Sequence, residues 1–215
     1  MKSHFFAYVS RMRFIQRWAL MRNTAPENVQ EHSHQAAVLA HALAVIRREK
    51  FGGTIDPGMA AAAALFHDAS EILTGDLPTP IKYDNPAIQT AYKDVEAVAE
   101  AKLLAMLPEE LQAAYRPLLI NTDPELEALV KAADKLSAHI KCLEELKAGN
   151  NEFRDAAQQT REALEACRLP ELDYFLETFL PGFSVTLDQR KYVGQQKNKN
   201  QKSFVSLCIL LGCKR

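Results

Sequence analysis

The sequence predicts an all-α fold, built as one helical domain. Apolar residues recur every three or four positions through most of the chain, a spacing that is typical of amphipathic helices. Runs of β-branched residues that alternate with polar ones, the usual mark of strands, are nearly absent. A chain of 215 residues is long enough for one substantial core but short for two domains.

The first helices follow from their apolar spacing and their end signals. One is expected from Ser3 to Gln16. A second is expected from Pro26 through Glu49, because proline favours a first helical turn and the glycines of "FGG" end the helix. Asp56 and Pro57 open a third, which we expect to carry the alanine-rich stretch into "LFHDASEIL" and to break at Gly75.

The C-terminal half is predicted to be helical as well. Its helices are expected over Pro86–Leu107, Glu109–Tyr115 and Pro124–Lys147, with one or two more in residues 152–168 and 171–180. The third of these should end at "AGNN", since glycine and asparagine readily adopt the left-handed conformation that closes a helix.

Charge is spread unevenly along the chain. Residues 186–215 carry seven Lys or Arg and one Asp, whereas residues 1–185 have a formal charge of −7. We therefore expect a domain over 1–185 followed by a basic, poorly ordered tail without an assigned role. The acidic domain argues against a nucleic-acid polymer as partner. No apolar run approaches the roughly 20 residues of a membrane span, so no membrane contact and a cytoplasmic location are expected.

Cysteine chemistry is not expected. The four cysteines form no CxxC pair and no dense framework, so free thiols are favoured over disulfides or a zinc site.

Four side chains that commonly bind metal ions lie on three predicted helices. These are His32 in "ENVQEHSHQAA", His67 and Asp68 in "LFHDASEIL", and Asp134 in "LVKAADKLSAHI". Asp134 borders an apolar stripe at the edge of the core, where a carboxylate needs a compensating charge. Two imidazoles and two carboxylates suit one divalent ion such as Mn, Co, Fe, Zn or Mg, and they do not select among these.

The order of these residues, and the segments around them, resemble a known family. The segments "RWALMRN", "ENVQEHS", "HDASEILTGDLPTPIKY" and "KAADKLSAHIKCLEELKAGNNEF" are similar to the YfbR-like bacterial 5'-deoxynucleotidases, which are HD-domain metal-dependent phosphohydrolases. The resemblance covers about Lys2 to Asp188. It implies a single HD-domain helical bundle with a metal site between helices, a homodimer, and hydrolysis of 2'-deoxyribonucleoside 5'-monophosphates.

The resemblance also implies roles for individual residues. It makes His32, His67, Asp68 and Asp134 the ligands of one divalent metal ion. It also implies that His32, Asp68 and Asp134 contact the substrate.

Substrate and proton-transfer roles follow from the same resemblance. Arg17 would orient the phosphate and Trp18 would line the sugar pocket. The loop that meets the nucleoside would consist of Asp76, Leu77, Pro78 and Thr79. Glu71 would transfer a proton, although Asp76 is an alternative carrier. A planar arginine fork can bind two phosphate oxygens, and a wall beside the 2' position can exclude a ribose hydroxyl. Little in the sequence offers readout of a base edge, so broad base tolerance is expected.

Other interpretations stay open on the sequence alone. One is another HD-type phosphohydrolase that acts on a cyclic or alarmone nucleotide, and another is a non-catalytic, dimeric nucleotide-sensing module. An arginine beside a tryptophan often makes only a surface cation–π contact. His4, His34, His41 and His139 have no companion ligands and are expected in surface or core positions. Glu31 is expected either to support a neighbouring metal ligand or to act as a capping partner, and not to bind metal itself. Lys82 could reach the phosphate, but a solvated position is expected.

Overall fold

The computed structural model describes residues 2–82, 85–186 and 189, and these confirm the all-α fold. Within them the only β-type pairing is one isolated bridge between Gln16 and Asn28. The helices are α1 (Phe5–Val9), the 3-10 helix η1 (Ser10–Phe14), α2 (Val29–Phe51), α3 (Pro57–Phe66), α4 (Glu71–Thr74), α5 (Thr79–Lys82), α6 (Pro86–Ala105), α7 (Glu109–Leu119), α8 (Pro124–Lys147), the 3-10 helix η2 (Asn151–Phe153), α9 (Arg154–Glu165), α10 (Pro170–Thr178) and α11 (Pro181–Ser184). The tail predicted for 186–215 lies almost wholly outside the described residues.

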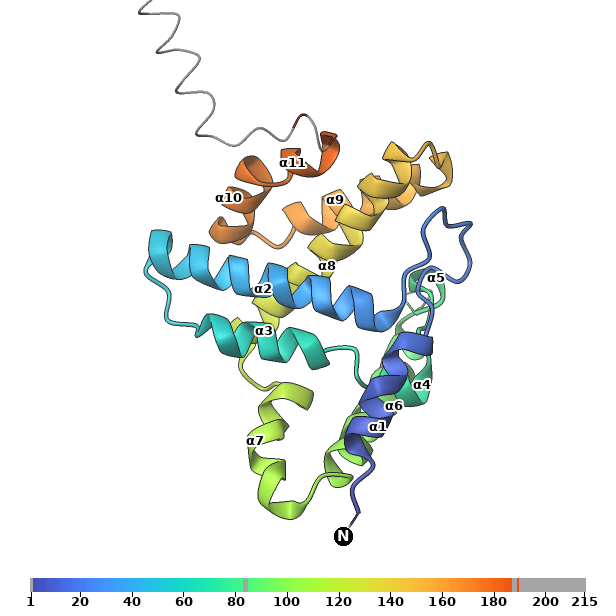
Figure 1. The fold of residues 1–215 in the computed structure, drawn as a ribbon, viewed down its shortest axis with the longest axis vertical. Coiled ribbons are helices and arrows are strands. Elements are labelled where there is room, and N and C mark those ends of the chain that lie inside the picture. Colours follow the sequence, from blue (N-terminus) through green and yellow to red (C-terminus); the bar gives the residue numbers. More distant parts are fainter. Residues whose placement is uncertain (1, 83–84, 187–188, 190–215) are drawn as a thin grey trace, which may run out of the picture.

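Helix α2 is the central element of the bundle. It packs along α3 on one side and against α8 and α10 on others (Figure 1). The main core lies between these helices and includes the fully buried Leu43, Leu129, Leu136 and Ile140. Burying one such side chain contributes about 1.5–3 kcal/mol, so this core supplies a rigid frame for polar residues at its edge.

A second core cluster joins α1, α6 and α7 at the end of the molecule away from α10 and α11 (Figure 1). Phe5 is fully buried there among Leu103, Leu104 and Leu119. Its ring also makes an edge contact with Tyr115, with 5.5 Å between the ring centroids. This cluster fixes the N-terminal segment, which leads directly to Arg17 and Trp18.

The ends of α2 follow their local sequence. The Asn28 side chain accepts a hydrogen bond from the Glu31 backbone N–H, and the Glu31 carboxylate accepts one from the Asn28 N–H. This reciprocal pair satisfies two donors that a helix start leaves free, which confirms the capping role of Glu31. Gly52 closes the helix at φ 70°, a left-handed conformation that favours glycine.

Several predicted helix bounds were wrong. The second helix begins at Val29 rather than Pro26, because Asn28 provides the capping box. The first becomes a 3-10 helix at Ser10 and ends at Phe14, where Ile15 takes extended backbone toward the bridge with Asn28. The helix opened by Asp56 ends at Phe66, and a turn separates it from α4.

A buried ion pair ties an irregular loop to α8. The Glu145 carboxylate pairs with Lys141 one turn earlier and accepts the backbone N–H groups of Thr24 and Ala25. It also accepts a bond from the Asn150 amide at 2.9 Å. The Glu145 side chain is 1% exposed, and these bonds outweigh its burial and hold the pKa of the carboxyl well below its usual range. The segment just before Glu27 is thereby attached to the core.

Two further expectations concern the whole chain. Among the described helices, none is both long and apolar enough to cross a bilayer. Of the cysteines in the described residues, Cys142 is buried and Cys167 half-buried, and both are free thiols, as predicted.

Candidate active site

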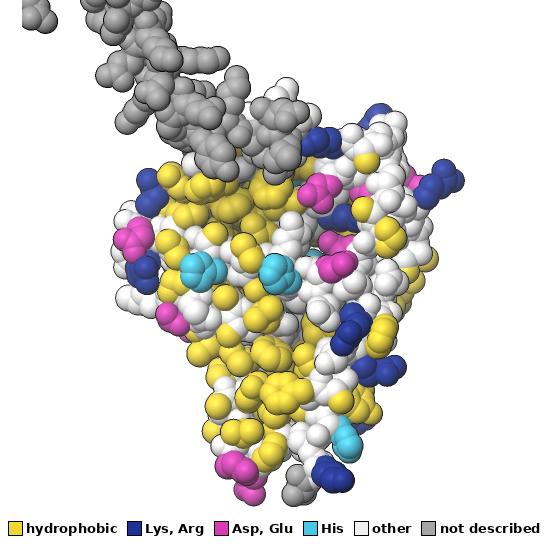
Figure 2. All heavy atoms as spheres, in the orientation of Figure 1, with side chains coloured by type: hydrophobic (Ala, Val, Ile, Leu, Met, Phe, Trp, Pro, Cys, Tyr) yellow, Lys and Arg dark blue, Asp and Glu magenta, His cyan; other side chains and the backbone are white. Residues whose placement is uncertain are grey.

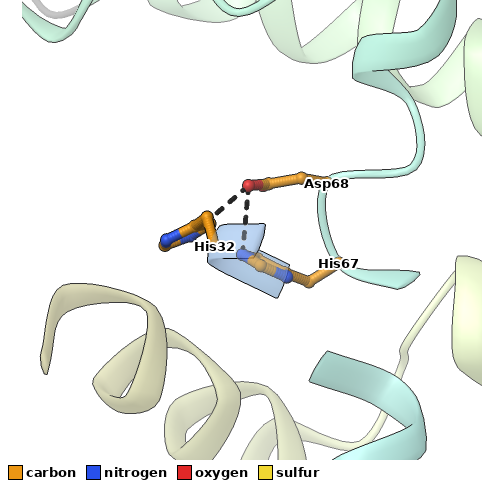
Figure 3. Close-up of side chains that lie close together, drawn as sticks. All are labelled: His32, His67 and Asp68. Atoms are coloured by element: carbon orange, nitrogen blue, oxygen red, sulfur yellow. Dashed lines mark ion pairs between the residues drawn. The ribbon is translucent and has the colours of Figure 1, made fainter. Parts of the chain in front are cut away.

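Two histidines and two aspartates predicted as metal ligands converge from three parts of the bundle. His32 lies on the first turns of α2, His67 caps the end of α3, Asp68 lies in the following turn, and Asp134 lies on α8. One ligand atom each from His32, His67 and Asp68 fits within 4.8 Å. Figure 3 shows these three side chains pointing toward one another.

The distances in this cluster run between imidazole nitrogens and carboxylate oxygens. The Oδ2 atom of Asp68 lies 3.2 Å from His67 Nε2 and 3.6 Å from His32 Nε2. The Oδ1 atom of Asp134 lies 3.0 Å from His32 Nε2 and 3.8 Å from His67 Nε2. Both Nε2 atoms therefore face both carboxylates.

Hydrogen bonds on the far side of each ring leave the Nε2 atoms free to bind a cation. His67 Nδ1 lies 2.7 Å from the carbonyl oxygen of Ala64 and must donate to it. Ser137 donates its single hydroxyl proton to Gln35, so the hydroxyl oxygen accepts from His32 Nδ1 at 3.1 Å. A neutral histidine that carries its proton on Nδ1 has its lone pair on Nε2, which is the usual arrangement in metal sites.

The surroundings of the cluster fit a cation. His67 Nε2 is buried, and although Asp68 Oδ2 lies 3.2 Å away, no group in the described part of the chain makes a well-aligned hydrogen bond to it. Buried polar atoms normally have a partner, so this atom points to a ligand. Two imidazoles with two carboxylates form a donor set that suits Zn, Mn, Co or Fe, with coordination positions left over for water and phosphate.

The titration of the cluster shows how strongly its charges interact. Burial alone would lower the pKa of His67, but Asp68 and Asp134 outweigh it and raise this pKa to about 9. Desolvation opposes ionisation of Asp134, yet its contacts with His32 and His67 hold its pKa well below the ordinary value. The carboxylates therefore demand a positive charge between them, which protons on the imidazoles or a divalent cation can provide.

Glu71 lies beside the cluster and is the most perturbed carboxyl near it. Its side chain begins α4 and is buried, and within the described residues its Oε2 atom has no hydrogen-bond partner. Burial, with the charges of Asp68 and Asp76 nearby, raises the pKa of Glu71 to about 9. At neutral pH such a group keeps its proton and can donate it.

Arg17 contacts Asp68, and Trp18 follows it in the chain. The Nη1 atom of Arg17 lies 3.2 Å from Asp68 Oδ2 and its Nε atom 3.3 Å from Glu27 Oε2. Trp18 donates its indole N–H to the same Glu27 oxygen at 3.0 Å and packs on Phe153 with 5.2 Å between ring centroids. The structure shows these contacts in place of the surface cation–π pair that the sequence left open.

The predicted nucleoside loop follows α4. Gly75 ends that helix at φ 75°, and its carbonyl oxygen accepts a hydrogen bond from the Tyr92 hydroxyl at 3.2 Å. The Asp76 carboxyl has a raised pKa, because burial outweighs the opposing charge of Arg17. Leu77 and Pro78 are half-buried. The side chain of Thr79 lies outside the described residues, and no described side chain of this loop hydrogen-bonds to the His–Asp cluster.

The structure shows three supporting residues that sequence reasoning did not identify, namely Glu27, Ser137 and Gln35. Ser137 follows Asp134 by three positions and Gln35 follows His32 by three, so helical spacing could have placed both beside the ligands. Glu27 lies in a loop, where no periodicity applies, and only its position directly before the Asn28 cap marks it.

The remaining histidines behave as predicted. His4, His34 and His41 are exposed. His139 is buried and hydrogen-bonds to the Thr160 hydroxyl at 2.9 Å. Lys82 is partly buried rather than simply solvated, since it pairs with Glu96 at 2.9 Å.

Comparison with known proteins identifies the family of the chain. Residues 4–183 match the family described as "5'-deoxynucleotidase YfbR-like". The 5'-deoxynucleotidase of Vibrio cholerae is 54% identical over 190 residues, which cover 87% of this chain and 98% of that protein.

Solved structures share the fold. An HD-domain phosphohydrolase from Listeria innocua matches with a TM-score of 0.72 at 22% identity, covering 93% of this chain and 98% of that one. The cyanophage S-2L HD phosphohydrolase DatZ matches with a TM-score of 0.56 at 21% identity, covering 80% and 93%. An all-α HD fold, a clustered His–His–Asp site and a family match over most of the length lead to one conclusion, that the chain belongs to the YfbR-like 5'-deoxynucleotidase family.

Proposed function

We propose that the protein is a metal-dependent phosphoric monoester hydrolase that converts 2'-deoxyribonucleoside 5'-monophosphates to deoxyribonucleoside and phosphate. One observation carries this proposal beyond the family match. Arg17, a cationic fork suited to phosphate, lies 3.2 Å from Asp68, which belongs to the His–His–Asp cluster. A phosphate bound by Arg17 would therefore lie beside a metal in that cluster.

The metal would be held by His32, His67, Asp68 and Asp134. A divalent cation bound there supplies Lewis acidity and lowers the pKa of water from about 16 to about 7, so hydroxide becomes available at neutral pH. Co, Mn and Zn all suit these ligands.

The protein groups would supply binding and proton transfer. Arg17 binds the phosphate oxygens and balances charge on the transferring group. Glu71, protonated at neutral pH, gives its proton to the leaving 5'-oxygen. Trp18 forms a wall at the 2' position of the sugar. Asp76 accepts a hydrogen bond from a sugar hydroxyl, and Leu77, Pro78 and Thr79 complete the nucleoside loop with tolerance for different bases.

The proposed activity predicts selective hydrolysis. With added Mn or Co, purified protein should release phosphate from dAMP faster than from AMP, because a ribose 2'-hydroxyl would meet an apolar wall without a partner. A chelator should abolish the release. A phosphate assay on both nucleotides in parallel measures this, with a cyclic nucleotide and an alarmone as further substrates.

Three outcomes would contradict the proposal. Equal turnover of dAMP and AMP would contradict the proposed selectivity for deoxyribose. Activity that is unaffected by the chelator would contradict the proposed dependence on a metal. Faster cleavage of the cyclic or alarmone nucleotide would favour another HD-type phosphohydrolase, and binding without turnover of any of them would favour a nucleotide-sensing module.

We also propose that the protein acts in the cytoplasm as a homodimer. Figure 2 shows hydrophobic side chains gathered over the face that α2, α3 and α7 present to the viewer. The exposed large hydrophobic residues on these helices are Val38, Phe51, Met59, Leu65 and Leu111. Exposed apolar surface of this extent supports association. Light scattering should give twice the chain mass of 24.1 kDa. A mass of 24.1 kDa at micromolar concentration would contradict the dimer.

A further inference from the structure

Glu27 holds two neighbouring side chains with one carboxylate oxygen. Its Oε2 atom lies 3.3 Å from Arg17 Nε and accepts the indole N–H of Trp18 at 3.0 Å. Its backbone carbonyl oxygen also accepts the N–H of Arg17 at 3.0 Å. The Glu27 side chain is only 11% exposed. One residue therefore fixes both the backbone and the side chains of the pair.

The backbone at Trp18 needs such a restraint. Trp18 has φ 58°, in the left-handed region that a bulky side chain rarely adopts. Strained conformations of this kind persist only where surrounding contacts hold them, and they concentrate at functional sites. Glu27 provides a hydrogen bond on the indole edge, and Phe153 provides packing on the ring.

The same carboxylate orients the arginine. With Nε directed to Glu27 and Nη1 directed to Asp68, the guanidinium plane is held between two carboxylates from different segments. A hydrogen bond to a charged acceptor is stronger and more directional than a neutral one. Loss of Glu27 would leave the fork attached at one end and free to rotate.

We propose that Glu27 is a positioning residue that couples phosphate binding to recognition of the sugar, by holding Arg17 and Trp18 in one fixed relation. The inference rests on the proposed function for what these two residues bind. It goes beyond that function because it assigns control of sugar selectivity to Glu27, which does not have to contact the substrate.

The test is the Glu27→Gln variant, with Glu31→Gln as matched control. Glutamine keeps the size of the side chain but removes the charge, so the one oxygen that accepts from both Arg17 and Trp18 becomes a weaker, neutral acceptor. Glu31 is exposed, and glutamine preserves its capping role, so the control makes the same chemical change four residues further along the chain.

Three readouts separate positioning from a general loss of structure. The kcat/KM for dAMP should fall about 10- to 100-fold in Glu27→Gln, as expected for losing a charge-assisted hydrogen bond. The ratio of dAMP to AMP turnover should fall toward one, and bound metal should stay unchanged. Trp18 is the single tryptophan, so its fluorescence reports the loosened indole directly, as an emission shift absent from Glu31→Gln.

A second variant keeps the inference testable if Glu27→Gln folds poorly by circular dichroism. Trp18→Phe removes the indole N–H and retains an aromatic ring against Phe153. It should bring the ratio of dAMP to AMP turnover toward one, and an unchanged ratio would mean that the hydrogen bond from the indole to Glu27 does not control recognition of the sugar.

Two results would overturn the assignment. Unchanged tryptophan emission in folded Glu27→Gln would mean that the carboxylate does not hold the indole. If the wild type prefers dAMP and Glu27→Gln keeps the same ratio of dAMP to AMP turnover, Glu27 does not control recognition of the sugar. If the wild type lacks selectivity altogether, the proposed function fails, and the emission still decides whether Glu27 holds Trp18.

Discussion

Replacing Asp68 with alanine is expected to remove the metal and lower the turnover of dAMP by about 10³-fold or more. Asp68 Oδ2 faces both imidazole Nε2 atoms and also Arg17 Nη1. Its loss removes a metal ligand and leaves the arginine fork without one of its partners. Metal chemistry contributes several kcal/mol to hydrolysis, and each 1.4 kcal/mol is a tenfold change in rate. Metal analysis of the purified variant and a phosphate assay measure the two effects.

Two controls separate the ligand from its surroundings. Asp94→Ala removes an exposed carboxylate on α6 and should change neither metal content nor rate. Arg17→Ala should retain the metal and lose rate, because in the proposed function the arginine would bind the phosphate and not the cation. Full metal occupancy in Asp68→Ala, or loss of metal from Arg17→Ala, would refute the assignment of ligands.

Replacing Glu71 with glutamine is expected to lower kcat for dAMP by about 10²- to 10⁴-fold while the metal remains bound. This is the range that one well-placed proton donor usually contributes. The raised pKa of about 9 keeps the Glu71 carboxyl protonated at neutral pH, and a donor of this kind loses its proton as the pH rises through its pKa. A bound cation favours the ionised carboxylate, so in the metal-loaded enzyme this loss of rate begins below pH 9. Rates measured from pH 6 to 10 should show the alkaline decline in wild type and not in the variant.

Asp76→Asn decides between the two proton carriers. Its pKa is raised as well, because burial outweighs the opposing charge of Arg17, but the side chain lies in the nucleoside loop. We expect this variant to raise KM more than it lowers kcat, since Asp76 would bind the sugar in both the ground state and the transition state. A Glu71→Gln variant with wild-type kcat, together with an Asp76→Asn variant that loses kcat, would reverse the roles.

Strong local signals in the sequence predicted the frame that carries the site. The bounds of α8 agree with the predicted Pro124–Lys147, because Asp123 caps the first turn and "AGNN" follows the last. Asp56 caps α3 through the Met59 backbone N–H, as its position before Pro57 indicated. These signals act within a few residues, so they can be read from one sequence.

The turn that carries His67 and Asp68 could not be predicted in the same way. Residues 63–74 have continuous apolar spacing, which indicates one helix, yet α3 ends at Phe66 and α4 begins at Glu71. Breaking the helix brings Asp68 toward Arg17 and the two imidazoles, and these contacts come from segments distant in sequence. Tertiary contacts of this kind override local propensity and leave no periodic signal.

The same distinction separates the site residues that were predicted from those that were missed. Side chains with metal-binding chemistry could be recognised by residue type and by their resemblance to a family. Glu27 could not, because its importance comes from the two donors that meet its Oε2 atom in the folded chain.

The attachment of Thr24 and Ala25 to Glu145 has a consequence for hydrogen exchange. Irregular loops usually exchange their amide protons through small local openings. Here both amides donate to a carboxylate that is 1% exposed, so freeing them would take two hydrogen bonds from a buried charge that keeps Lys141 and Asn150 as partners. Their exchange is therefore expected to be much slower than that of an ordinary loop. The segment that leads into Glu27 shares the cooperative stability of the bundle, although it contains no helix.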